Sequence, residues 1–127
     1  MARLFIDVDD TLVLYTERKA GPNPLGLERD MNFRVNAELV DAIKIWRRHN
    51  IDGQVVVWSG GGEAYARSAG DRFIPGVATW YFTKGGKNLT LPNHDDLLVD
   101  DSPTELGLGE VDAPVLLPEE FIESMNI

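Results

Sequence analysis

Residues 4–12 read Leu-Phe-Ile-Asp-Val-Asp-Asp-Thr-Leu, an apolar run that leads into a group of acids. The apolar part is typical of a strand buried on both faces, as in a parallel sheet. Three carboxylates, on Asp7, Asp9 and Asp10, fall within four residues where the strand leaves the sheet. Like charges this close repel one another unless a cation or hydrogen-bond donors lie among them. The pattern favours a bound Mg²⁺, which prefers oxygen ligands, over the simpler alternative of a solvated acidic turn.

The composition limits the classes of function. With 127 residues, 43% of them apolar, the chain suffices for one globular domain, residues 1–127. The net charge of −9 argues against stable nucleic-acid binding, which depends on contacts with phosphate backbone. The absence of cysteine excludes disulfides and zinc–thiolate sites. The sequence has no signal-peptide pattern and no long apolar run, so we expect a soluble cytoplasmic protein without a membrane partner.

Apolar and amphipathic segments alternate along the rest of the chain. The spacing predicts strands and helices in this order: strand 4–8, helix 37–50 behind the N-cap Asn36, strand 54–58, helix 63–73, strands 77–82, 97–99 and 115–117, and helix 119–125. This alternation indicates an α/β fold, a doubly wound, Rossmann-like parallel sheet of about five strands with helices on both faces. Residues 16–33, rich in glycine and proline, are predicted to form a surface flap or loose hairpin. Asp96, before the fourth strand, is interpreted as a solvated loop residue.

Three of the predicted strands end in polar residues suited to catalysis. Asp7 and Asp9 follow the first strand, Ser59 follows the second, and Asp100 and Asp101 follow the fourth. In open parallel sheets, ligands bind at the carboxyl ends of the strands, near a switch in strand order. If these strands are neighbours, we therefore expect their terminal side chains to converge on one edge of the sheet.

These motifs resemble, in order and across most of the chain, those of the haloacid dehalogenase (HAD) superfamily of phosphotransferases: Asp7-Val8-Asp9-Asp10-Thr11, Ser59, Lys84 or Lys87, and Asp100-Asp101. The resemblance implies that Asp7 is the nucleophile and forms an aspartyl-phosphate. It implies that Asp9 is the general acid and then the general base. A lysine would neutralise charge on the nucleophile and phosphate. Lys87 is preferred by its place before the last acidic strand, and Lys84 stays open.

The resemblance also implies a metal site. Asp7, the backbone carbonyl of Asp9, and Asp100 would hold a Mg²⁺ ion, and Asp101 would bind it through water or brace its ligands. Asp10 stands where the family commonly has glycine, and we interpret it as a turn residue rather than a ligand.

A substrate site is implied beside the metal. Ser59 and the backbone N–H of Gly60 would bind a phosphoryl oxygen, because glycine lets the backbone approach an anion. A helix N-cap is the alternative role of Ser59, and both roles are compatible. Thr11 is grouped with this substrate site, where it would support the turn by hydrogen bonding to the Asp7 region.

We therefore expect an HAD-type phosphatase, a magnesium-dependent phosphomonoester hydrolase. The gaps between the motifs leave no room for a cap domain. An open site suits a bulky phosphorylated substrate, such as a nucleic-acid end, a nucleotide or a phosphoprotein. Oligomerisation that closes the site over a small molecule is the alternative. The sequence leaves open whether phosphate passes to water or to another acceptor.

Two other functions are compatible with such a sheet. A receiver-like domain also carries acids, Ser or Thr, and Lys, but its phosphorylated aspartate ends a middle strand, whereas the comparable strand here ends in Trp58 and Ser59. A catalytically silent phosphate-binding domain would not need the reactive residues, all of which are present.

Overall fold

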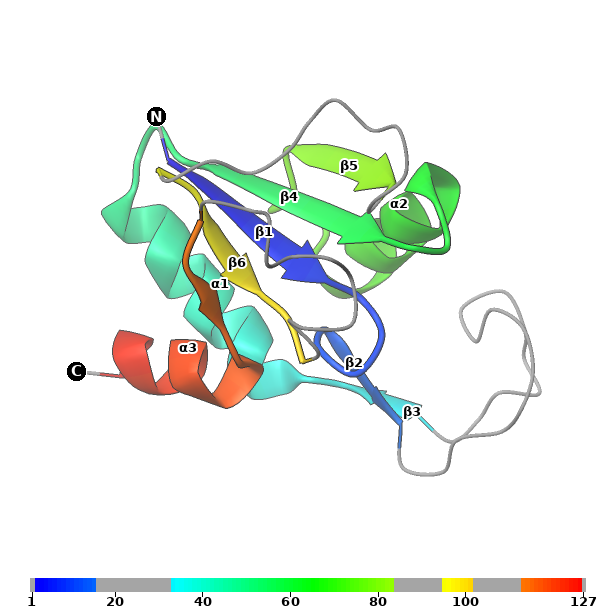
Figure 1. Cartoon of the computed structure of the whole chain (residues 1–127), viewed down its shortest axis with the longest axis horizontal. Helices are drawn as coiled ribbons and strands as arrows, with labels where there is room; N and C mark the ends of the chain where they lie inside the picture. Colours follow the sequence, from blue (N-terminus) through cyan, green and yellow to red (C-terminus); the bar gives the residue numbers. More distant parts are fainter. Residues whose placement is uncertain (1, 16–32, 84–94, 102–112, 127) are drawn as a thin grey trace.

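The computed structural model describes residues 2–15, 33–83, 95–101 and 113–126. Strand β1 lies in the middle of a parallel sheet, and helix α3 packs beside α1 (Figure 1). A short ribbon of β2 and β3 extends beyond the end of β1 (Figure 1). In chain order the elements are β1 (Arg3–Asp7), β2 (Val13–Tyr15), β3 (Phe33–Val35), α1 (Ala37–His49), β4 (Gln54–Ser59), α2 (Glu63–Phe73), β5 (Trp80–Thr83), β6 (Leu97–Val99), β7 (Val115–Leu116) and α3 (Pro118–Met125).

The sheet has five parallel strands in the order β5-β4-β1-β6-β7. From β1 the chain adds β4 and β5 on one side and later β6 and β7 on the other. The residues of β1 from Leu4 to Ile6 pair with β4 and with β6, so this strand is central. The predicted doubly wound α/β fold is confirmed, and the strand order reverses beside the end of β1, where Asp7 lies.

One face of the sheet carries the main core. Leu4 and Ile6 of β1 point into it, as the period of two along a strand requires. The three helices in the described part of the chain all pack on this side, and the apolar stripe predicted for α1 is confirmed. The helices contribute Leu39, Ala42, Ile43 and Trp46 from α1, Tyr65, Ala66 and Ala69 from α2, and Phe121 from α3.

The other face carries a smaller cluster. Phe5, Trp58 and Leu98 are at most 2% exposed, and the Phe5 and Trp58 rings meet edge to face, with centroids 4.8 Å apart. No described helix contributes to this cluster. Residues 84–94 and 102–112, which join β5 to β6 and β6 to β7, lie outside the described residues. Helices on this face therefore stay a prediction.

The ends of most predicted elements agree closely with the structure. Asn36 is the N-cap of α1, and its Oδ1 accepts a hydrogen bond from the backbone N–H of Leu39 at 3.2 Å. The largest difference is the third strand of the sheet, which begins at Trp80 rather than at residue 77. A turn closed by the N–H of Val77 and the carbonyl of Ile74 (3.1 Å) precedes it. Gly76 takes a φ of +78° in this turn, so the chain becomes extended, and β5 begins, only after it.

The predicted flap lies, in chain order, between two short strands that pair with each other. Strands β2 and β3 pair in antiparallel fashion, with Val13 opposite Val35. Phe33 therefore belongs to β3 rather than to the flap. Residues 16–32 lie outside the described part of the chain. The absence of a cap domain therefore stays a prediction. No helix within the described ranges is long and apolar enough to cross a membrane.

The interpretation of Asp96 as a solvated loop residue was wrong. The residue is 2% exposed, and its side chain accepts two hydrogen bonds from Arg3, at 3.1 Å from Nε and 2.7 Å from Nη2. The partner was not evident because the two residues lie 93 positions apart. The parallel pairing of β1 with β6 brings them together at the amino ends of the strands.

Candidate metal and active site

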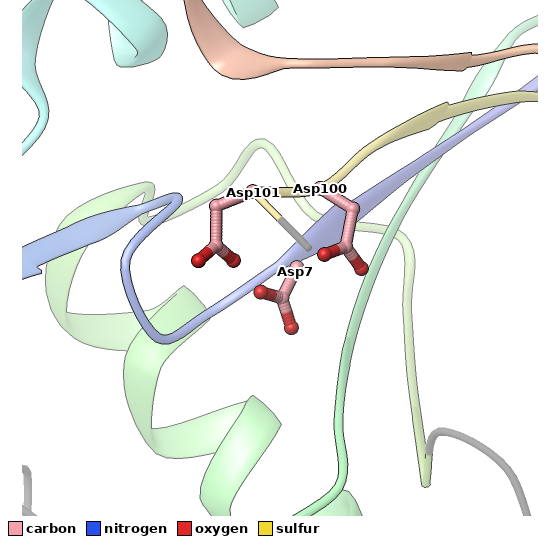
Figure 2. Close-up of side chains that lie close together, drawn as sticks. All are labelled: Asp7, Asp100 and Asp101. Atoms are coloured by element: carbon pink, nitrogen blue, oxygen red, sulfur yellow. The ribbon is translucent and has the colours of Figure 1, made fainter. Parts of the chain in front are cut away.

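Three carboxylates meet where β1 and β6 end. Asp7 closes β1, and Asp100 and Asp101 follow β6 directly. One carboxylate oxygen from each of the three lies within 4.8 Å of the others. Figure 2 shows the three side chains gathered around the ends of these two strands. The predicted convergence of the first and fourth strands on one edge is thus present in the structure.

The strand register explains why these acids meet. Ile6 of β1 pairs with Val99 of β6, so the next residues, Asp7 and Asp100, follow side by side. Both acids are buried, with 8% of Asp7 and 1% of Asp100 exposed. Oxygen ligands from two adjacent strands, largely withdrawn from water, form a donor set that can hold a divalent cation. Without a cation, the same burial would intensify the repulsion between them.

Thr11 braces two of these acids. Its side chain has no exposed surface, and its Oγ1 lies 3.2 Å from Oδ2 of Asp7 and 3.2 Å from Oδ1 of Asp101. The same oxygen accepts a hydrogen bond from the backbone N–H of Asp101 at 3.1 Å. A hydroxyl has one hydrogen, so it donates to one carboxylate at a time. The contacts support the predicted role in the turn, while a contact with substrate stays a prediction.

The turn after β1 is compact. The carbonyl of Val8 accepts hydrogen bonds from the backbone N–H groups of Thr11, Leu12 and Val13 at 3.0–3.3 Å. Asp10 adopts a φ of +60° in this turn. Glycine is the usual residue at such a position, and aspartate is among the few others that tolerate it. The carboxylate of Asp10 does not join the three-acid group, in agreement with its interpretation as a turn residue.

Asp9 points elsewhere. Its carboxylate is not part of the three-acid group, and its Oδ1 accepts a hydrogen bond from the hydroxyl of Tyr65 at 2.5 Å. The sequence analysis expects Asp9 to bind the metal through its backbone carbonyl oxygen, and this contact stays a prediction. Sequence reasoning missed Tyr65 as a site residue because it fits the apolar face of α2. The available signal was a polar group on that face, in the first turn after a glycine-rich loop.

Ser59 and Gly60 lie at the carboxyl end of β4, next to β1. Trp58 pairs with Asp7, so Ser59 is the next residue of β4, beside the carboxyl end of β1. The Ser59 hydroxyl oxygen accepts a hydrogen bond from the N–H of Gly61 at 3.0 Å. Ser59 does not cap α2, because the N-cap is Gly62 and no side chain bonds there. A Cβ at Gly60 would meet open space, so this backbone is accessible to a ligand.

The predicted active-site lysines, Lys84 and Lys87, lie outside the described residues. The choice between them, and the positive charge either would bring, remain predictions.

A pocket of about 490 Å³ adjoins the acids. It reaches from Asp10 and Asp101 to helix α3, which sequence reasoning did not associate with the site. Its remaining lining residues come from β2, α1 and α3 with their flanking positions: Leu14, Asn36, Glu38, Leu117, Pro118, Glu119, Ile122, Glu123 and Asn126.

No protein-family model, curated protein or solved structure matches this chain. The resemblance to the HAD superfamily therefore depends on the motifs, and the function is argued from the site itself.

Proposed function

We propose that this protein is a Mg²⁺-dependent phosphomonoester hydrolase in which Asp7 is the nucleophile. The observation that carries the proposal is the meeting of Asp7, Asp100 and Asp101 within 4.8 Å at the ends of adjacent strands. A second acid, Asp9, lies two residues beyond the nucleophile and is held separately by Tyr65. In this proposal, the carboxyl end of the sheet supplies a cation site, a nucleophile and an acid for proton transfer.

In the first step, a carboxylate oxygen of Asp7 attacks phosphorus. A bond forms between this oxygen and phosphorus, and the bond from phosphorus to the leaving oxygen breaks. The carboxyl group of Asp9 gives its proton to the leaving oxygen, so the product departs as an alcohol. The result is an aspartyl-phosphate on Asp7 and an ionised Asp9.

In the second step, Asp9 takes a proton from water as the water oxygen attacks phosphorus. The bond between phosphorus and Asp7 then breaks, which releases inorganic phosphate and restores the Asp7 carboxylate. Ser59 and the N–H of Gly60 bind phosphoryl oxygens, and Lys87 or Lys84 balances their charge.

Asp7, Asp100 and Asp101 would hold the Mg²⁺, which neutralises the repulsion between the nucleophile and the phosphate. The carboxylate oxygens suit a hard cation, and the described site has no sulfur or imidazole ligand that would favour a softer one.

The strand order weighs against the receiver-like alternative. Numbered along the chain, the sheet strands are arranged third, second, first, fourth, fifth. Receiver domains have the order second, first, third, fourth, fifth. The acid-bearing β1 is the first strand in the chain and lies in the centre of the sheet, between β4 and β6.

The proposal is tested with an aryl phosphate in the presence of Mg²⁺ or a chelator. We expect turnover that requires Mg²⁺ and that falls to the uncatalysed rate in Asp7→Asn. Acid-quenched wild-type protein should carry phosphate that hydroxylamine releases, as an acyl phosphate does. Asp52→Asn is the matched control, since Asp52 is exposed in the turn between α1 and β4. Full activity in Asp7→Asn would reject the assignment of the nucleophile.

A panel of phosphorylated oligonucleotides, nucleotides, sugar phosphates and phosphopeptides then identifies the substrate class. Activity on polymer ends or phosphoproteins would support the open, capless site. A strict preference for small molecules would support closure by another segment or another copy.

A further inference from the structure

We propose that Tyr65 is the positioning residue of Asp9: its hydroxyl fixes the carboxyl group that exchanges a proton with the leaving group and with water. This inference rests on the proposed function and adds a residue that the HAD-like motifs do not include. Its starting point is the hydrogen bond from the Tyr65 hydroxyl to Oδ1 of Asp9, between residues 56 positions apart.

The Tyr65 ring has little freedom to move. It is 7% exposed and belongs to the main core, together with Ala66 and Ala69 of the same helix. A side chain held in this way keeps its hydroxyl in one place. The hydrogen bond therefore restricts the position of the Asp9 carboxyl group, and the Tyr65 ring does not adjust to Asp9. Asp9 itself is half-buried in a turn, so a bond from a fixed hydroxyl narrows the orientations open to its carboxyl group.

Gly61 provides a second, independent observation. A Cβ at this position would lie 3.0 Å and 3.2 Å from Cδ2 and Cγ of Tyr65. The loop after β4 therefore packs its backbone directly against the Tyr65 ring. The N–H of the same glycine bonds the Ser59 hydroxyl oxygen. Tyr65 thus links the acid after β1 to the loop that carries the predicted phosphoryl-binding residues.

This arrangement has a chemical consequence. Tyr65 keeps its own proton, and the proton that moves is the one shared between Asp9 and the leaving oxygen. Without the Tyr65 hydroxyl, Asp9 would protonate a poor leaving group less effectively. A good leaving group departs without protonation, so its hydrolysis would change little. Selective loss with basic leaving groups therefore distinguishes a positioning role from general damage to the fold.

The experiment compares wild-type protein and Tyr65→Phe on a series of ring-substituted phenyl phosphates with Mg²⁺. These substrates share their shape and differ in the basicity of the phenol that leaves. We expect kcat/KM of Tyr65→Phe to fall about 10-fold or more for the most basic phenols, a part of the full effect of a general acid. For nitrophenyl phosphate, the fall should be about 2-fold or less.

Tyr81→Phe is the matched control. Tyr81 also donates its hydroxyl to an aspartate, Asp71, at 2.9 Å, but on the exposed side of α2 and β5. Burial of the ring and then the bond to Asp71 raise the pKa of Tyr81, so its phenol is neutral at the assay pH. This variant removes an equivalent bond and should leave the dependence on the leaving group unchanged.

The outcomes separate the two proposals. If wild-type protein hydrolyses none of the substrates, the proposed function fails and the role of Tyr65 fails with it. If the wild type is active but Tyr65→Phe loses equal activity on every substrate, or none, the role of Tyr65 alone is rejected. Should Tyr65→Phe fail to fold, Gly61→Ala displaces the ring while retaining the hydroxyl. The same selective loss is then expected, and its absence overturns the inference.

Discussion

The hydroxyl of Thr11 contacts three polar groups with one oxygen. It lies between the carboxylates of Asp7 and Asp101 and accepts the backbone N–H of Asp101. Because the side chain is fully buried, water cannot replace these bonds without rearrangement. A single hydroxyl therefore fixes how the ends of β1 and β6 approach one another.

Thr11→Val keeps the shape of the side chain and removes these bonds. We expect the free energy of unfolding to fall by about 1–3 kcal/mol, because a buried backbone N–H loses this acceptor. The Asp7 and Asp101 carboxylates also lose their shared donor, so the proposed phosphatase activity should fall. Urea denaturation and the aryl phosphate assay measure the two effects.

Thr79→Val is the control for this variant. Thr79 is exposed, and its hydroxyl accepts one bond, from the N–H of Val55, which is weak because it is 3.4 Å long. We expect its unfolding free energy to change by about 0.5 kcal/mol or less. A Thr11→Val protein as stable as this control would contradict the bracing role.

At the scale of elements, two contacts hold β1 beside the segment that contains β6. The acids and Thr11 lie at the carboxyl ends, and the Arg3–Asp96 pair lies at the amino ends. The Asp96 side chain is 1% exposed, whereas that of Arg3 is 22% exposed and packs over the Phe5 ring, 5.0 Å from its centroid. The pair thus lies at the opposite end of the strands from the proposed chemistry, and we expect it to stabilise the pairing of β1 with β6.

Asp96→Asn should destabilise the protein without loss of activity. Breaking a fully buried ion pair costs about 3–5 kcal/mol, and the partial exposure of Arg3 reduces the expected loss to about 1–3 kcal/mol. Urea denaturation measures the loss, with Asp52→Asn as the exposed control. Equal stability of the two variants would show that the pair contributes nothing, and a specific loss of kcat would show that it influences the site.

On the scale of the whole molecule, the candidate cation site joins distant parts of the chain. Asp7 and Asp100 are brought together only when β1 and β6 pair, so the site exists in the folded protein and not in the unfolded chain. A ligand that binds only the folded state stabilises it, by about 2.7 kcal/mol at 100 times its dissociation constant.

We therefore expect Mg²⁺ to raise the Tm of the wild-type protein. In the presence of a chelator, Asp100→Asn should be the more stable protein, by about 1–3 kcal/mol, because one of three repelling carboxylates becomes an amide. Added Mg²⁺ should then stabilise the wild type and leave Asp100→Asn unchanged. Calorimetric scans of both proteins, with and without Mg²⁺, provide the measurement. An equal response of the two proteins to Mg²⁺ would place the ion elsewhere.

Local patterns in the chain were enough to predict most elements. Asn36 followed by an amphipathic run predicted α1 and its cap, and short apolar runs predicted β1, β4 and β6. These features depend on capping and on hydrophobic periodicity, which act between neighbours in sequence. The start of β5 was less predictable, since the turn through Gly76 extends further than composition suggests.

The candidate site was predictable in part for a related reason. Acids at the ends of β1 and β6 stood out because buried strands rarely end in clustered charge, and a parallel sheet places such ends on one edge. Thr11 was expected near Asp7, but its second contact, with Asp101, depends on residues 90 positions apart. No local pattern encodes such a contact.

The residues alone thus specified the alternation of strands and helices, the buried first strand and the acidic side chains at its end. Packing in three dimensions decided that β6 lies beside β1, that Arg3 pairs with Asp96 and that Tyr65 reaches Asp9. The physical reason is range: periodicity and capping operate over a few residues, whereas these partners meet only after the whole sheet and its helices have assembled.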